Sequence, residues 1–287
     1  TWGLHSHARL TDPPGMRILF SQSESVSYKK GDRMQISGSS AIVFGGAGGL
    51  GEATVRRLHG AGAKVVVADL ADDKGKELAA ELGIPYVRTD VTDDADVLAA
   101  IAEAEALGPL RVSVDTHGGP AGGGRLVGKD GSPMEMEAFT KTITFYLTAV
   151  FNVMRHVAAA MARQEPDENG ARGVIINTAS IAAYEGQIGQ LPYSAAKGGV
   201  VAMTLVAARD LSPLGILLMS IAPGTINTPA YGKAADQLEA YWGPQVPFPK
   251  RMGRSVEYGQ LALSIAENDY LNGETIRLDG ALRFPPK

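Results

Sequence analysis

Short apolar runs alternate with longer amphipathic stretches from residue 41 to the C-terminal end of the chain. A few apolar residues between turn residues are typical of a buried strand, whereas ten or more residues with apolar positions three or four apart are typical of a helix. The apolar runs predict strands at 41–44, 64–70, 86–88, 111–114, 174–177, 216–221 and 274–278. The longer stretches predict helices at 49–58, 74–82, 95–107, 135–163 and 193–211.

Strands that alternate with helices in this order form a parallel sheet, because each helix carries the chain back to the same edge. The sequence therefore predicts the α/β class. We expect a single doubly wound parallel sheet of about seven strands, a Rossmann fold, with helices on both faces. Residues 34–287 are expected to form this one domain.

Residues 1–33 differ from the rest of the chain. They contain Pro13-Pro14-Gly15 and a Ser-rich stretch, and they show no sustained periodicity. We expect a poorly ordered extension or an added remnant that is no part of the fold. A targeting peptide is the alternative, against which the acidic residues Asp12, Glu24 and Asp32 argue.

Composition excludes several classes of function. The chain has a net charge of −4 and a pI of about 5.8, without a basic stripe, so a nucleic-acid partner is not expected. No apolar run reaches the roughly 20 residues of a membrane span. No cysteine is present, which excludes disulfides and agrees with a reducing compartment. No two histidines stand at metal-ligand spacing on a helix, so no metal is expected. We expect a cytoplasmic protein, with the mitochondrial matrix as the alternative.

A glycine-rich run at residues 45–51 joins the first predicted strand to the first predicted helix. Glycines at such a junction allow a tight turn and a close approach of the backbone to a pyrophosphate, which the helix N-terminus then binds. A plain glycine-rich turn is the structural alternative. The candidate cofactor residues here are Gly45, Gly48, Gly49, Leu50 and Gly51.

Asp69 ends the second predicted strand, eighteen residues after Gly51. A carboxylate there would accept hydrogen bonds from the adenosine ribose and repel a 2′-phosphate, so NAD is expected rather than NADP. Alternatively, Asp69 only caps the next helix. Asp90 and Val91, after the third strand, would lie beside the adenine.

Tyr193 and Lys197 stand four residues apart on one helix, with Ser180 thirteen residues before the tyrosine. Residues at this spacing share a helix face. An ammonium about 4 Å from the phenol is worth about 4 kcal/mol, or about three pKa units. We therefore expect Lys197 to bring the pKa of Tyr193 toward neutrality, where general acid–base catalysis is efficient. Ser180 would hold the substrate oxygen.

These residues, with Asn177-Thr178-Ala179-Ser180 and Pro223-Gly224, resemble the short-chain dehydrogenase/reductase superfamily from about Met34 to the C-terminus. Within it, the stretches 165–177, 185–190, 245–249 and 271–281 resemble the type-2 3-hydroxyacyl-CoA dehydrogenases, also known as 17β-hydroxysteroid dehydrogenases type 10. The resemblance implies an NAD-dependent homotetramer in which residues 34–287 form one NAD-binding catalytic domain. It implies oxidation of short-chain 3-hydroxyacyl-CoA, in fatty acid metabolism, or of hydroxysteroids.

The resemblance also assigns roles. Tyr193 would be the general acid/base, Lys197 would lower the tyrosine's pKa and hold the nicotinamide ribose, and Ser180 would orient the substrate oxygen. The nicotinamide carboxamide would lie at Ile226 and Thr228. The remaining cofactor positions that the resemblance implies are Gly48, Leu50, Thr116, Gly118 and Pro223.

Three departures from the family pattern stand out. Phe44 replaces a threonine whose hydroxyl would tie two strand ends together. Asp115 and His117 stand in a motif that usually reads Asn-x-Ala-Gly. Tyr146 takes the place of the fourth catalytic residue, an asparagine that supports a water linked to the active lysine.

Two loops are expected around the substrate. Residues 228–250 would form a lid with Tyr231, Tyr241, Trp242 and Phe248 lining an apolar pocket, ordinary packing being the alternative. The Gly-rich loop 118–133 would border the same pocket. Hydroxysteroid dehydrogenase and 3-oxoacyl-carrier-protein reductase are alternatives within the superfamily, and a non-catalytic NAD-binding scaffold is the alternative of another class.

Overall fold

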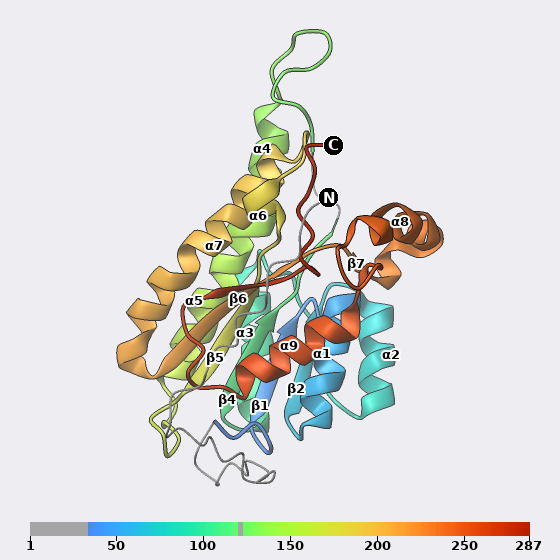
Figure 1. Ribbon diagram of the computed structural model, residues 1–287. Helices are drawn as coiled ribbons and strands as arrows, with labels where there is room; N and C mark the ends of the chain where they lie inside the picture. Colours follow the sequence, from blue (N-terminus) through green and yellow to red (C-terminus); the bar gives the residue numbers. More distant parts are fainter. Residues whose placement is uncertain (1–33, 120–122) are drawn as a thin grey trace, which may run out of the picture.

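The computed structural model describes residues 34–119 and 123–287 (Figure 1). The extension expected at residues 1–33 lies outside the described residues, as do residues 120–122 of the loop expected at 118–133.

The main sheet has seven strands in the order β3-β2-β1-β4-β5-β6-β9, and all neighbouring strands run parallel. The strand order reverses between β1 and β4, so the predicted doubly wound sheet is confirmed. Its strands are β1 (Ser40–Phe44), β2 (Lys64–Asp69), β3 (Tyr86–Arg88), β4 (Leu110–Asp115), β5 (Gly173–Thr178), β6 (Ile216–Pro223) and β9 (Thr275–Leu278). A separate pair consists of β7 (Ile226–Asn227) and β8 (Gly253–Arg254).

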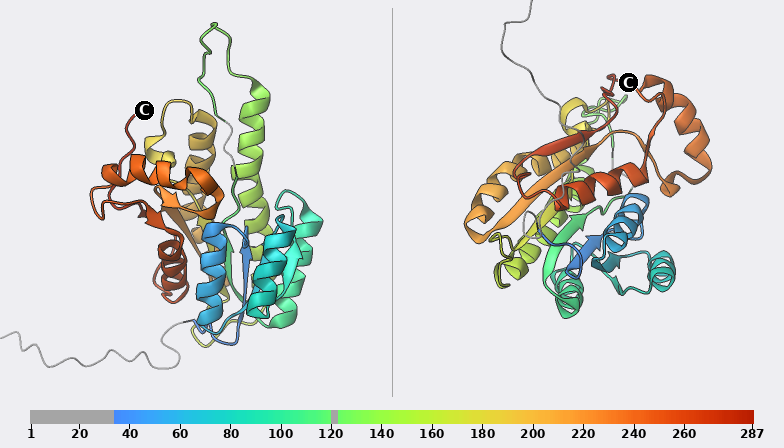
Figure 2. Two further views of the ribbon diagram at one scale, coloured as in Figure 1. Left: turned by 90° about the vertical axis from the view of Figure 1, so that its right-hand side faces the viewer. Right: turned by 60° about the horizontal axis from the view of Figure 1, so that its bottom comes forward.

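Helices cover both faces of the sheet, as predicted (Figures 1 and 2). The helices that connect or flank the strands are α1 (Gly49–Gly60), α2 (Asp72–Leu82), α3 (Asp94–Leu107), α4 (Met136–Ile143), α5 (Ala149–Ala162), α6 (Ala182–Glu185), α7 (Leu191–Leu211) and α9 (Ser255–Ala266). Beyond β7 lie η3 (Pro229–Ala234), α8 (Ala235–Trp242) and η4 (Gly243–Gln245), and η2 (Ser212–Leu214) follows α7.

Alternate residues of the strands belong to two different cores. Val43, Val65 and Val67 pack under α1 and α9, whereas Ile42 and Val66 pack under α3 and α5. Successive side chains of a strand point to opposite faces. Because both faces are covered, the strands read as continuous apolar runs, which is why they could be recognised in the sequence.

The predicted helix at 135–163 is interrupted. Between α4 and α5 lies a π-helical turn, η1 (Thr144–Thr148), which contains Tyr146. Single π-turns inside α-helices often occur at functional sites. The apolar periodicity continues through the turn, so the sequence pattern does not reveal it.

Helix α9 was not predicted. It packs closely along α1, where a Cβ on Gly259 would lie 2.6 Å from the carbonyl oxygen of Ala53. A glycine lowers helix propensity, and here close packing of two helices requires it. The helix therefore depends on a tertiary contact that the local pattern does not show.

Two helical stretches, Met136–Ala162 and Leu191–Leu214, are long and apolar enough to cross a membrane by length and composition, contrary to the expectation that no stretch is. Both contribute side chains to the core of this α/β domain. Core helices of globular proteins meet the same criterion, so these two do not indicate a membrane protein.

The segment 123–135 projects beyond the body of the domain before α4 begins (Figure 1). Val127 and Pro133 form an isolated antiparallel bridge within it, and Gly124 bridges to Gln190 at the base. The expected lid at 228–250 is largely helical, because it contains η3, α8 and η4.

Candidate active site

The carboxyl ends of four central strands meet at one edge of the sheet. Phe44, Asp115, Thr178 and Pro223 are the last residues of β1, β4, β5 and β6. In doubly wound sheets ligands bind at this edge, beside the point where the strand order reverses. A cavity of about 180 Å³ lies here. The predicted site residues that line it are Leu50, Thr116, Gly118, Ser180, Tyr193, Lys197, Pro223, Ile226 and Thr228.

The glycine-rich turn has the geometry of a phosphate-binding turn. Gly45 has a φ of +73°, and a Cβ on it would lie 2.6 Å from the backbone of His117. A Cβ on Gly51 would lie 2.0 Å from the Gly45 carbonyl oxygen. Helix α1 begins at Gly49 without a side-chain cap on its first amides. The turn therefore leaves room and amide donors for a pyrophosphate. Gly48 and Gly49 line a second cavity of about 270 Å³ between α1 and α2.

Phe44 lacks the hydroxyl of the usual threonine, and Thr116, which directly follows the neighbouring strand β4, supplies a hydroxyl instead. The Thr116 hydroxyl donates to the carbonyl oxygens of Phe44 (2.9 Å) and Gly45 (3.1 Å). The ends of β1 and β4 are therefore tied by a hydroxyl, contrary to the loss that Phe44 suggested. Only the tertiary structure shows that the hydroxyl comes from the other strand.

Asp69 connects the end of β2 to the glycine-rich turn. One carboxylate oxygen accepts from the Ala47 amide (2.9 Å), and the other accepts from the Ala71 amide (2.9 Å) just before α2. Asp69 thus bonds the residue before α2 but none of the first amides of that helix, so the capping alternative is not confirmed, and its carboxylate also faces the turn. Each oxygen keeps lone pairs for a further donor.

Asp90 and Val91 follow β3 but do not line the central cavity. The Asp90 carboxylate accepts from the amide (2.9 Å) and hydroxyl (2.6 Å) of Thr92, and these hydrogen bonds lower its pKa. Val91 is buried, and its carbonyl oxygen accepts from the Asn152 amide. Asp90 thus has a local partner, and Val91 has one on the distant helix α5.

Lys197 is buried at the centre of the site. Its ammonium donates to the Thr178 carbonyl oxygen at 2.7 Å. Burial lowers the pKa of Lys197 to about 8, although the nearby Asp115 charge acts in the opposite direction. The ammonium also lies 5.9 Å from the centre of the Tyr193 ring.

The pKa of Tyr193 differs from the expectation. Burial raises it to about 12, and the nearby Ser180 hydroxyl lowers it only in part. The expected fall toward neutrality assumed a partly solvated phenol about 4 Å from the ammonium. Desolvation disfavours the phenolate and is the larger effect in this geometry.

Two residues that line the cavity, Thr178 and Gly119, were not predicted as site residues from the sequence. The Thr178 hydroxyl donates to the Asp115 carbonyl oxygen and accepts from the Tyr258 hydroxyl at 2.7 Å. The Gly119 amide donates a hydrogen bond to the Tyr146 hydroxyl at 3.1 Å. Thr178 stands in the motif that ends at Ser180, which could have indicated it, whereas no sequence signal links it to Tyr258.

Of the four aromatic residues expected in an apolar substrate pocket, only Tyr231 lines the central cavity. Trp242 packs against Phe284, and the Tyr241 and Phe248 side chains are exposed. Packing and solvent exposure therefore explain the other three.

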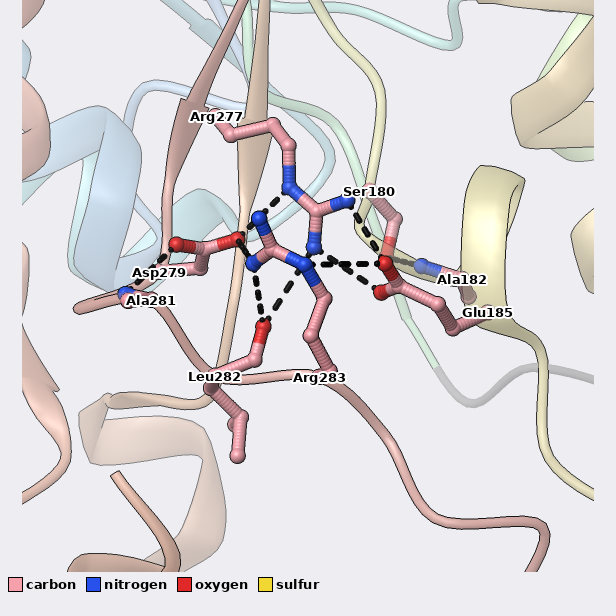
Figure 3. Close-up of polar contacts among 8 residues, drawn as sticks. All are labelled: Ser180, Ala182, Glu185, Arg277, Asp279, Ala281, Leu282 and Arg283. Carbon is pink, nitrogen blue, oxygen red and sulfur yellow. Dashed lines mark hydrogen bonds and ion pairs between the residues drawn. The ribbon is translucent and has the colours of Figure 1, made fainter. Parts of the chain in front are cut away.

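A network of ion pairs connects helix α6, which follows Ser180, to the C-terminal segment (Figure 3). Arg277 on β9 binds both carboxylate oxygens of Glu185 on α6, at 2.7 and 2.8 Å, and its Nε donates to Asp279 at 2.7 Å. At the other end of α6, the Ala182 amide donates to the Ser180 hydroxyl at 3.1 Å. The C-terminal segment and the segment of Ser180 are thereby joined through one short helix.

A family model described as short chain dehydrogenase matches residues 39–239. The chain belongs to the short-chain dehydrogenases. A relative in this family from Bos taurus, 3-hydroxyacyl-CoA dehydrogenase type-2, is 46% identical over 254 residues, which cover 88% of this chain and 97% of the relative. The Homo sapiens protein of the same name is 45% identical over the same shares.

Solved structures agree with this assignment to the short-chain dehydrogenases. The crystal structure of 3-hydroxyacyl-CoA dehydrogenase type-2 from Mycobacterium avium has a TM-score of 0.85 and 55% identity, covering 87% of this chain and 98% of that chain. The predicted resemblance to this group is confirmed. This short-chain dehydrogenase is therefore an oxidoreductase, of a family whose members generally use a nicotinamide cofactor.

Proposed function

We propose that this short-chain dehydrogenase uses NAD to interconvert a secondary alcohol and a ketone, with a short-chain 3-hydroxyacyl-CoA as the alcohol and the 3-oxoacyl-CoA as the ketone. The observation that carries the proposal is that Ser180, Tyr193 and Lys197 line one cavity beside the uncapped start of α1. The likeness to type-2 3-hydroxyacyl-CoA dehydrogenases over nearly their whole length supports the substrate class.

NAD supplies the hydride acceptor when it is bound. Tyr193, when ionised, takes the hydroxyl proton of the alcohol as the carbon loses its hydride, and the protonated phenol donates a proton to the substrate oxygen in ketone reduction. Ser180 donates to the substrate oxygen, and Lys197 provides the positive charge beside the phenol. Because burial raises the pKa of Tyr193 to about 12, the protonated phenol predominates, which favours ketone reduction near neutral pH.

The preference for NAD follows from Asp69. Its carboxylate faces the glycine-rich turn, where the adenosine ribose hydroxyls would donate to it and a 2′-phosphate would be repelled. The glycine-rich turn would hold the pyrophosphate, while Thr116, Ile226 and Thr228 line the cavity on the nicotinamide side.

We further propose that the protein forms a homo-oligomer, a tetramer as the family resemblance implies. Residues 34–287 of each copy would form one NAD-binding catalytic domain. The protein would act in fatty acid metabolism. A cytoplasmic location, with the mitochondrial matrix as the alternative, stays a prediction.

A non-catalytic NAD-binding protein is the second candidate, because Tyr146 replaces a catalytic asparagine and lies edge-on to Tyr193 with ring centres 5.0 Å apart.

The test mixes the protein with NAD and 3-hydroxybutyryl-CoA and follows NADH absorbance. Tyr193→Phe should abolish turnover, because no other group would move the proton, and should leave NADH binding within a few-fold. Turnover that survives the substitution would exclude the tyrosine mechanism. NADH binding by the unmodified protein without turnover, across acyl-CoA, acyl-carrier-protein and steroid substrates, would favour the non-catalytic candidate.

A further inference from the structure

Three of the residues that depart from the family pattern, Asp115, His117 and Tyr146, lie together in the fold. Asp115 is the last residue of β4, His117 lies two residues further along the chain, and both are buried. The His117 Nδ1 lies 2.5 Å from an Asp115 carboxylate oxygen, and the His117 Nε2 lies 2.7 Å from the Phe145 carbonyl oxygen. Phe145 directly precedes Tyr146.

A change in backbone hydrogen bonding makes the Phe145 carbonyl available. In an α-helix the Ala149 amide would donate to Phe145, four residues earlier. In the π-helical turn η1 this amide donates to Thr144 instead. His117 Nε2 supplies a donor in its place. A carbonyl oxygen only accepts, so Nε2 is the donor to Phe145, and Nδ1 lies against the Asp115 carboxylate.

Tyr146 is held in a fixed orientation on this turn. Its hydroxyl donates to the Gly119 carbonyl oxygen and accepts from the Gly119 amide. Its ring meets the Phe145 ring edge-on, with centres 4.9 Å apart, and Phe145 meets His117 in the same way at 5.2 Å. Each of these rings is therefore packed against the next.

The Tyr146 ring continues this series to the Tyr193 ring and also lies against the Lys197 ammonium. The Lys197 ammonium lies 5.0 Å from the centre of the ring, close enough for a cation–π interaction. The titratable groups that face Lys197 are Asp115 from β4, Tyr146 from η1 and Tyr193 from α7. Among the described residues, the second Asp115 carboxylate oxygen is buried without a hydrogen-bond partner.

We propose that Asp115, His117 and Tyr146 form one positioning device, in which the buried carboxylate–imidazole pair fixes the π-turn and the turn holds an aromatic ring against the Lys197 ammonium. The inference rests on the proposed function, because it assigns Lys197 a catalytic role. The ring stabilises the charged lysine at the position where the family resemblance implies an asparagine and its water. The three replacements thus act as a coupled set.

The test compares Tyr146→Leu with Tyr146→Phe, which keeps the ring and loses only the hydroxyl. Lysine labelled with ¹³C at Cε is titrated by NMR in each protein, and Lys197→Met identifies the signal of Lys197. Loss of the ring should lower the pKa of Lys197 by about one pH unit, since a desolvated cation–π contact is worth about 1–2 kcal/mol. Tyr146→Phe should retain most of the original value. Equal pKa values in the two variants would overturn the proposal.

The anchor is tested separately by the ¹⁵N spectrum of the His117 ring. The Nε2 nitrogen should show the shift of a protonated donor, and an Nε2 without a proton would contradict its contact with the Phe145 carbonyl. If Tyr146→Leu does not fold, Tyr146→Met removes the ring at similar volume and gives the same comparison. Neither measurement needs a substrate. A protein without turnover whose variants still differ in the pKa of Lys197 would refute the proposed function and leave the positioning device standing.

Discussion

Lys197 shows how burial and charge compete at a single residue. Its pKa falls from the usual 10.5 to about 8, a change that corresponds to about 3 kcal/mol against the charged form. The Thr178 carbonyl and the Tyr146 ring offset part of the lost hydration, since both interact with the ammonium. The same desolvation keeps the Tyr193 phenol protonated. Burial therefore dominates both members of the pair.

We expect Lys197 to make the stability of the protein depend on pH. The unfolded chain keeps this proton up to about pH 10.5, whereas the folded chain releases it near pH 8. Between these values the unfolded chain binds more protons, so the free energy of unfolding rises with pH. Between pH 7.5 and 9.5, the free energy of unfolding of the unmodified protein should rise by about 2 kcal/mol relative to that of Lys197→Met. Denaturant unfolding at the two pH values measures this difference. An equal pH dependence of the free energy of unfolding in the two proteins would show that Lys197 is not desolvated.

Asp69 offers a second test at the residue scale. Asp69→Asn keeps an acceptor for one of the amides of Ala47 and Ala71 but removes the negative charge. The variant should bind NADP about tenfold more tightly, the ratio for about 1.4 kcal/mol of lost repulsion, while NAD affinity changes less. Titration with both reduced coenzymes measures the ratio. An unchanged ratio would mean that Asp69 serves only to hold the amides of Ala47 and Ala71.

At the scale of elements, the short helix α6 links Ser180, the serine proposed to hold the substrate oxygen, to the C-terminal segment. Ile181, next to Ser180, packs with Val246 and Leu282 in one small core. Arg277 holds the far end of α6 through Glu185 (Figure 3). A helix of four residues has little intrinsic stability, so its position depends on these tertiary contacts.

We expect Glu185→Ala to displace α6 and with it the Ser180 hydroxyl. The Arg277 and Glu185 side chains are 22% and 24% exposed, so breaking the pair should cost about 2 kcal/mol, between the values for surface and buried pairs. Turnover should fall with little change in NADH binding. Arg283→Ala is the matched control, because Arg283 contacts the same two carboxylates from a side chain that is 56% exposed. Similar losses in the two variants would argue against a positioning role for Arg277.

At the scale of the whole molecule, apolar side chains remain exposed on the outer helices. Phe151 on α5 and Leu205 and Val206 on α7 are between 46% and 59% exposed. Exposed apolar patches on helices often mark interfaces. They agree with the proposed homo-oligomer, since α5 and α7 cover the same face of the sheet.

We expect Val206→Glu to reduce the oligomer, because a carboxylate would be buried in the proposed interface. Sedimentation velocity should then show a smaller species at micromolar concentration. Tyr270→Glu is the control, since Tyr270 is 98% exposed and lies outside these helices. An unchanged sedimentation coefficient for Val206→Glu would place the interface elsewhere.

The sequence by itself determined the fold class, the glycine-rich turn and the helical spacing of Tyr193 and Lys197. Each depends on neighbours within a few residues, so period and spacing are sufficient to predict it. The tertiary structure alone decided which distant residues meet: Thr116 with Phe44, His117 with Phe145, and Arg277 with Glu185. It also decided the direction of the Tyr193 pKa. Desolvation and long-range hydrogen bonds depend on how far the folded chain excludes water, which no local pattern records.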